Sequence, residues 1–90
     1  MSSRQSNSQS GEFLPGIILP PAIHGLLRKR LAELGMCDTA VNCMILQART
    51  ESLVEALEIL QAIPARDVER LYVLIDNMTQ DRLAEISGKG

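Results

Sequence analysis

The central segment of the chain, residues 38–63, has more apolar positions than one face of a helix can hold. At about 100° per residue, these positions form two rows that lie side by side along a helix. A helix on the surface of a small protein needs only one such row, because only one side packs against the core. The segment is therefore predicted to be a helix that is buried on two sides. The first row is Val41, Met44, Ile45, Ala48, Ser52, Ala56, Ile59, Ala62 and Ile63, and the second, the leucine row, is Leu46, Leu53, Leu57 and Leu60.

A polar stretch, residues 49–52, interrupts this segment. Ser52 and Glu55 have the spacing of a capping box, in which serine and glutamate side chains satisfy free N–H groups at the start of a helix. Two interpretations follow. Either one unbroken helix runs from its N-cap, Asp38 or Thr39, to about residue 62, or the helix kinks or restarts near Glu51.

The same apolar spacing predicts one helix before and one helix after the central segment. The first runs from Pro21 or Ala22 to Leu34, since proline is tolerated in the first turn and Gly35 favours termination. Pro64 ends the central helix, and a third helix follows it up to about residue 87. The short connection at Pro64 predicts antiparallel packing of the second and third helices.

The N-terminal part of the chain changes character twice. Residues 1–12 are rich in serine, and we expect a disordered tail because they offer almost nothing for a core to bury. Residues 13–21 combine apolar side chains with prolines and a glycine, which predicts an extended strap. The strap either covers the core of its own subunit, or it binds a partner or pairs with a second copy as a strand. Its apolar residues are Phe13, Leu14, Ile17, Ile18 and Leu19.

The composition favours an all-α fold. Hydrophobic residues make up 46% of the chain but aromatic residues only 2%, which suits an aliphatic core between helices better than a sheet. A chain of 90 residues leaves much of its surface exposed, so that it gains stability from a second subunit. We therefore expect one helical domain over residues 22–87, a helical hairpin with an additional N-terminal helix. It would form an intertwined or four-helix-type homodimer through the leucine row.

The charge is unevenly distributed. The formal net charge of −2 excludes a protein whose whole surface follows nucleic acid. Residues 1–50 contain five basic against three acidic side chains, whereas residues 51–90 contain four basic against eight acidic ones. The two halves can therefore attract each other within a chain or between chains. Three of the acids, Glu51, Glu55 and Glu58, recur along one edge of the central helix and are expected to be a hydrated row.

No pattern of catalytic, cofactor-binding or metal-ligating residues stands out. His24 is the only histidine and is expected on the outer face of the first helix, without a titrating partner. Cys37 and Cys43 are six positions apart, which fits neither a redox CxxC motif nor half of a zinc site, so we expect reduced, packed thiols. The sequence thus indicates a protein that is not an enzyme and uses no small-molecule substrate, cofactor or metal.

One motif points to DNA. The segment LAELGMCDTAV, residues 31–41, resembles the turn and the start of the second helix in helix-turn-helix DNA-binding domains, with Gly35 in the turn. The resemblance implies a first motif helix over residues 28–34 and a recognition helix over residues 38–49. The other interpretation is an ordinary helical hairpin with a glycine in its turn. The resemblance assigns phosphate contacts to Arg28, Lys29 and Arg30, and a groove-facing surface to Thr39, Asn42, Cys43, Gln47 and Arg49.

These observations favour a small non-enzymatic regulatory or adaptor protein that acts as a homodimer by binding another protein, with modulation of transcription as one role in that class. The alternative is a transcriptional regulator that binds DNA directly through the helix-turn-helix-like motif. Residues 1–10 lack the apolar core of a signal peptide, and residues 13–23 are too short and too rich in proline to span a bilayer. We therefore expect a cytoplasmic protein without membrane association.

Overall fold

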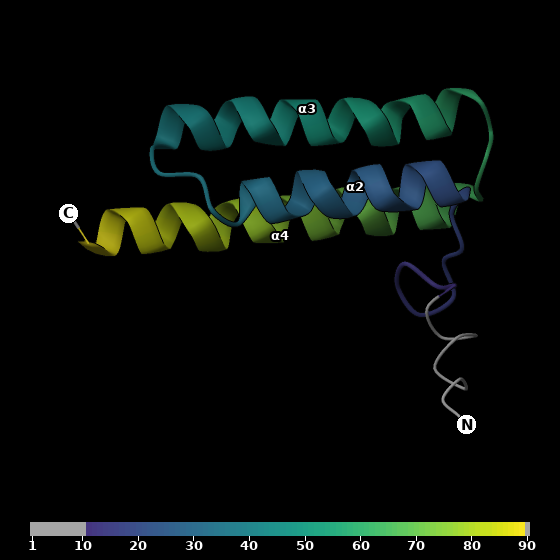
Figure 1. The fold of residues 1–90 in the computed structure, drawn as a ribbon, viewed down its shortest axis with the longest axis horizontal. Coiled ribbons are helices and arrows are strands. Elements are labelled where there is room, and N and C mark those ends of the chain that lie inside the picture. Colours follow the sequence, from purple (N-terminus) through teal and green to yellow (C-terminus); the bar gives the residue numbers. More distant parts are fainter. Residues whose placement is uncertain (1–10, 90) are drawn as a thin grey trace.

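Three helices make up most of residues 11–89, the part of the chain that this computed structural model describes. They are α2 (Pro21–Leu34), α3 (Ala40–Ile59) and α4 (Ala65–Lys89). In Figure 1, α3 runs antiparallel to α2, and α4 runs in the same direction as α2; every pair of helices is in contact. The expected all-α fold of three helices is confirmed, and residues 11–89 contain no strand. Most of the tail expected over residues 1–12 lies outside the described residues.

Local signals in the sequence determine where α2 and α3 begin. Helix α2 has the predicted bounds, with Pro21 in its first turn and Gly35 as its C-cap. Of the two candidate N-caps for α3, the structure uses Thr39, whose Oγ1 accepts a hydrogen bond of 3.1 Å from the N–H of Asn42. This bond satisfies one of the N–H groups that the first turn of a helix leaves free.

The polar stretch at residues 49–52 does not divide α3, so the interpretation of a kink or restart is wrong. The hydroxyl of Thr50 donates to the carbonyl of Leu46 at 2.7 Å, and the hydroxyl of Ser52 donates to the carbonyl of Ala48 at 2.9 Å. Both side chains therefore find acceptors one turn earlier in the same helix, and neither needs to cap a new one.

Helix α3 ends at Ile59, about one turn before the predicted end. Gln61 adopts a left-handed backbone with a φ of 54°. Its N–H donates to the carbonyl of Glu58, and the N–H of Ala62 donates to the carbonyl of Leu57, each at 3.0 Å. This pair of bonds is a Schellman motif, which ends a helix by satisfying its last carbonyl groups. Helix α4 then begins at Ala65, as the position of Pro64 predicted.

The prediction of an extended strap is wrong, because the strap folds into a tight turn. Pro15 and Gly16 occupy the two central positions of a β-turn, with a φ of 85° at Gly16, and the N–H of Ile17 donates to the carbonyl of Leu14 at 2.8 Å. Proline followed by a glycine with positive φ is typical of a type II turn. The turn brings Phe13 and Ile17 into the core, where both are almost fully buried. The strap therefore covers the core of its own chain.

The two cysteines form a disulfide, so the expectation of reduced thiols is wrong. Cys37 follows the end of α2, and Cys43 lies in the first turn of α3. The tight connection between the helices brings their Cα atoms to 5.5 Å from each other, which is a usual separation for a disulfide. The bond ties the ends of the two helices together, and both cysteines are buried.

The leucine row of α3 points toward α2 and α4 rather than toward solvent. Leu57 is buried, while Leu46 and Leu53 are partly buried against the core; only Leu60, at the end of the helix, is exposed. This differs from the expectation that the row lies on a subunit surface. The reason is that α2 and α4 both pack on the same side of α3, so the leucines serve the core of the chain itself.

Candidate protein-binding surface on helix α3

The first apolar row of α3 lies open to solvent, although this helix was predicted to be buried on two sides. We call the exposed part of this row, together with the exposed Leu60 from the end of the leucine row, the outer stripe. It begins with Val41, which is 67% exposed, and ends with Ile59 and Leu60, which are 72% and 75% exposed. Large apolar side chains gathered on one exposed face are typical of an interaction surface. The outer stripe consists of Val41, Met44, Ile45, Ala48, Ser52, Ala56, Ile59 and Leu60.

The side-chain sizes along the outer stripe are arranged symmetrically. Its middle holds the small residues Ala48, Ser52 and Ala56, all of them exposed. Large aliphatic residues lie beyond them toward both ends of the helix. Small residues in the middle of a helix face allow a second helix to approach closely, while large residues at the ends supply apolar area to bury.

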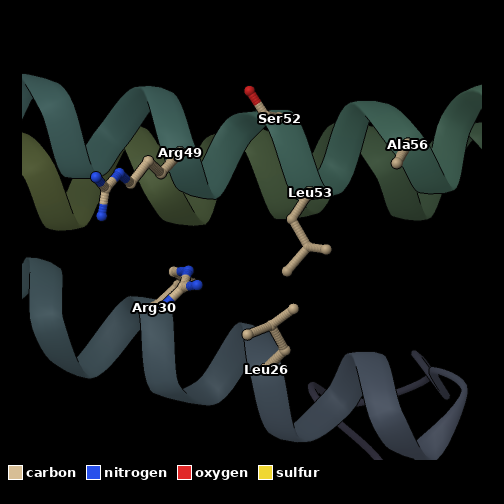
Figure 2. Close-up of a pocket in the computed structure, with 6 residues that line it drawn as sticks. All are labelled: Leu26, Arg30, Arg49, Ser52, Leu53 and Ala56. Carbon is tan, nitrogen blue, oxygen red and sulfur yellow. The ribbon is translucent and has the colours of Figure 1, made fainter.

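One edge of the outer stripe is basic. A cavity of about 440 Å³ lies between α2 and α3. Figure 2 shows Arg30 and Arg49, one from each helix, near each other at its edge. In the same view, Leu26 and Leu53 point toward each other across the cavity, whereas the Ser52 hydroxyl points away from α2. The lining contains two guanidinium groups and apolar carbon, which suits a carboxylate next to apolar atoms. The six lining residues are Leu26, Arg30, Arg49, Ser52, Leu53 and Ala56.

The two arginines at this edge differ in how they are paired. Arg30 forms an ion pair with Glu33 at 3.2 Å, one turn along α2. Arg49 is exposed and takes part in none of the ion pairs found among residues 11–89. Its guanidinium group is therefore available to a carboxylate from outside the chain.

The opposite edge of the outer stripe is acidic and lies beside α4. Burial raises the pKa of Tyr72, a residue of α4, above its ordinary value of 10.0, and the negative charges of Glu58, Glu55 and Glu51 raise this pKa further. The phenol group therefore lies close to the acidic row of α3. Glu55 and Glu58 are exposed, as the expected hydrated row requires, while Glu51 is half-buried and accepts a bond of 3.5 Å from Gln47.

The predicted strap site is split between the core and the surface. Ile17 is fully buried, and Phe13 and Leu19 are almost fully buried. These three side chains are therefore not free to bind a partner. Ile18 is 68% exposed. Leu14 is half-buried and lines a second cavity, of about 390 Å³, between the strap and α4. The other residues around that cavity are Glu69, Arg70, Val73 and Leu74.

The residues proposed for nucleic-acid contact do not form one surface. Arg28 donates a bond of 2.8 Å to the carbonyl of Phe13, and its guanidinium carbon lies 4.3 Å from the centre of that ring. Lys29 is exposed and, unlike Arg30, does not line the cavity toward α3. Asn42 shares a shallow hollow with Arg49 at the start of α3, and Gln47 is half-buried beside Glu51.

The arrangement of α2 and α3 also differs from that of a helix-turn-helix motif. The two helices run antiparallel along each other in Figure 1, whereas the helices of a helix-turn-helix motif cross at about 90–120°. The disulfide between Cys37 and Cys43 closes the connection into a tight hairpin turn. The geometry is that of an ordinary helical hairpin with a glycine in its turn.

His24 is half-buried rather than on the outer face where it was expected. Its ring packs edge-to-face against Phe13, with 5.3 Å between the ring centroids.

Across residues 11–89, no group of three His, Cys, Asp or Glu side chains is placed to hold a metal ion. None of the helices in that range has the length and apolar character that crossing a bilayer requires.

A signal for the correct inner face of α3 was present in the sequence. At about 100° per residue, Cys43, Thr50 and Val54 lie roughly opposite Ser52, next to the leucine row. All three are fully buried. Together with the leucines they form one wide inner face, which leaves the first row outside. Sequence reasoning missed this face because Thr50, which lies between Cys43 and Val54 on it, is polar. Its burial is explained only by the hydrogen bond of its hydroxyl within the helix.

No protein-family model matches this chain, and neither a curated protein nor a solved structure shows significant similarity to it.

Proposed function

We propose that this chain is a small non-enzymatic regulatory or adaptor protein that acts as a homodimer through the outer stripe of α3 and binds another protein with its remaining surface. The observation that carries the proposal is the exposure of large aliphatic residues at both ends of one face of α3, among them Val41, Ile59 and Leu60. Burying such a face against a second subunit removes apolar area from water, which is the main favourable contribution to association.

The surface left for a partner protein is the cavity between the strap and α4. It contains no residue of the outer stripe, and it combines apolar carbon from Leu14, Val73 and Leu74 with the charged groups of Glu69 and Arg70. An apolar centre with a charged rim is typical of protein interfaces.

The experiment that tests the homodimer is sedimentation equilibrium of the wild-type chain and of the double variant Ile45→Glu/Ile59→Glu. The wild type should have twice the mass of the 9.9 kDa chain. The double variant should be a monomer with unchanged helix content, because Ile45 and Ile59 are exposed in the single chain and a charge there needs no burial. Val73→Glu, which places the same charge on an exposed apolar residue of α4, should remain a dimer.

A wild-type chain that sediments as a monomer at every concentration would refute the proposal.

Direct DNA binding, the alternative expected from the helix-turn-helix resemblance, predicts a salt-sensitive shift of duplex DNA that is lost when Lys29 and Arg49 are replaced by glutamate. The cytoplasmic location expected from the sequence remains a prediction. The redox state of Cys37 and Cys43 in cells tests it, since disulfides persist mainly in oxidising compartments.

A further inference from the structure

The outer stripe has edges of opposite charge, and Ser52 lies midway between them. Successive helix residues are rotated by about 100°. Arg49 therefore lies about 60° to one side of Ser52, and Glu55 lies about 60° to the other side. The Arg49 edge adjoins α2, where Arg30 reaches into the same cavity. The Glu55 edge adjoins α4 and continues into Glu58, so the stripe separates a basic edge from an acidic one.

A two-fold axis can relate two copies of this face in two ways. If the axis runs along α3, the two helices are parallel, and the basic edge of one copy faces the acidic edge of the other. If the axis runs across α3, the helices are antiparallel, and each edge faces its own kind. Like charges placed opposite each other cost free energy, whereas opposite charges select the partner and its orientation. The charge pattern therefore favours the parallel arrangement.

The symmetric arrangement of side-chain sizes is compatible with parallel pairing, in which each position of the stripe meets itself. Ser52, Ala48 and Ala56 then form a closely packed centre, and Ile45 and Ile59 pack against their own copies on either side. The cavity beside α2 also gains an occupant. Its two guanidinium groups and its apolar lining from Leu26 and Leu53 are complementary to a glutamate from a neighbouring helix.

We propose that a second copy of this chain docks on the outer stripe with its α3 parallel, so that Arg49 of each copy lies against Glu55 of the other. This inference rests on the homodimer proposed above and specifies its orientation. The cavity lined by Arg30 and Arg49 is then completed only in the dimer, where it receives the carboxylate of the second copy.

Charge-reversal variants test the pairing, with the dimer dissociation constant as the measurement. Arg49→Glu and Glu55→Arg should each weaken the dimer about tenfold, because each leaves like charges opposed at both edges. The double variant Arg49→Glu/Glu55→Arg should recover the wild-type dissociation constant. Asp76→Arg, the same change of charge on the exposed face of α4, should have no effect. Circular dichroism of each variant checks that the helices remain folded.

An antiparallel dimer gives a different result, because its basic edges already face each other, as do its acidic edges. Either single variant would then leave the dissociation constant unchanged, and this outcome would overturn the parallel pairing while the homodimer stands. A wild-type chain that is monomeric at all concentrations would instead overturn both proposals.

Cysteine substitutions provide a second, independent test. The two native cysteines are paired with each other, so a new cysteine is the only free thiol in the chain. Parallel pairing predicts that Ala48→Cys, Ser52→Cys and Ala56→Cys each form an intermolecular disulfide on mild oxidation, since each residue meets its own copy. Antiparallel pairing allows such a bond at no more than one of these positions, and that result would overturn the inference. Val73→Cys on α4 serves as the control that should not cross-link.

Discussion

The guanidinium group of Arg28 stabilises the strap through two contacts. It donates a hydrogen bond of 2.8 Å to the carbonyl of Phe13 and lies 4.3 Å from the centre of the Phe13 ring. The planar, charged group thus satisfies a strap carbonyl and covers an aromatic face at the same time. Lys29 is its direct neighbour and is exposed. Of these two adjacent basic residues, we therefore expect Arg28 to stabilise the fold and Lys29 to contribute little.

Replacing Arg28 by alanine should lower the free energy of unfolding by about 1 kcal/mol, since both contacts to Phe13 are lost. Arg28→Lys should recover only part of this, because an ammonium group keeps the charge but lacks the planar fork. Lys29→Ala should change the stability by less than about 0.5 kcal/mol. Urea unfolding followed by circular dichroism measures all three. Equal losses for the Arg28→Ala and Lys29→Ala variants would show that the strap contact contributes nothing.

At the scale of elements, the contact between α3 and α4 makes the stability of the protein depend on pH. Burial and the nearby Glu58, Glu55 and Glu51 raise the pKa of Tyr72 above 10.0. The unfolded chain therefore loses the phenol proton at a lower pH than the folded chain does. The resulting contribution to stability is fully present below pH 10, and it is lost as the pH rises from about 10 through the pKa of the folded state.

Absorbance titration measures this effect directly, because Tyr72 is the only tyrosine and the chain has no tryptophan. The native protein should titrate at a higher pH than the same protein in concentrated urea. Glu58→Gln should move the native midpoint down, since the variant removes the negative charge that raises the pKa of Tyr72 most. Glu85→Gln, an exposed acid elsewhere on α4, should leave it unchanged. Coincident native and unfolded midpoints would contradict the proximity of Tyr72 to the acidic row.

The sequence predicted the elements better than their orientation, for a physical reason. Proline, glycine and threonine act on their own turn, so Pro21, Gly35 and Thr39 determine helix ends without help from the rest of the chain. The rotation of α3 about its axis is decided by the packing of two other helices. Because both of its sides are apolar, periodicity alone could not show which one faces inward. The surface proposed from the structure therefore lies on the same helix as the surface predicted from the sequence, but on the other side of that helix.

At the scale of the whole molecule, the helical core is closed at both ends by different means. At the N-terminal end of α2, the strap folds over the core, and Arg70 of α4 donates a bond of 2.9 Å to the carbonyl of Pro15. At the opposite end, the disulfide joins α2 to α3, and Arg82 of α4 donates a bond of 2.8 Å to the carbonyl of Cys37. Figure 1 shows the strap and the turn between α2 and α3 at these two ends. Coverage of the core by the strap was one of the two interpretations of the sequence, whereas the disulfide and the two arginine bonds were not predicted. Each of these bonds joins residues far apart in sequence or depends on a tight turn.

Reduction of the disulfide should lower the free energy of unfolding by about 2 kcal/mol. This is the chain entropy that closing a loop of this length removes from the unfolded state, for cysteines with a sequence separation of 6. Urea unfolding with and without a thiol reductant measures this difference in the free energy of unfolding, and it does so without any substitution in the protein. The double variant Cys37→Ala/Cys43→Ala should be less stable than the oxidised wild type and insensitive to the reductant, which shows that the reductant acts at this bond. Two results together would instead support packed, reduced cysteines. The wild type would have the same stability with and without reductant, and two thiols would react with an alkylating reagent after unfolding without reductant.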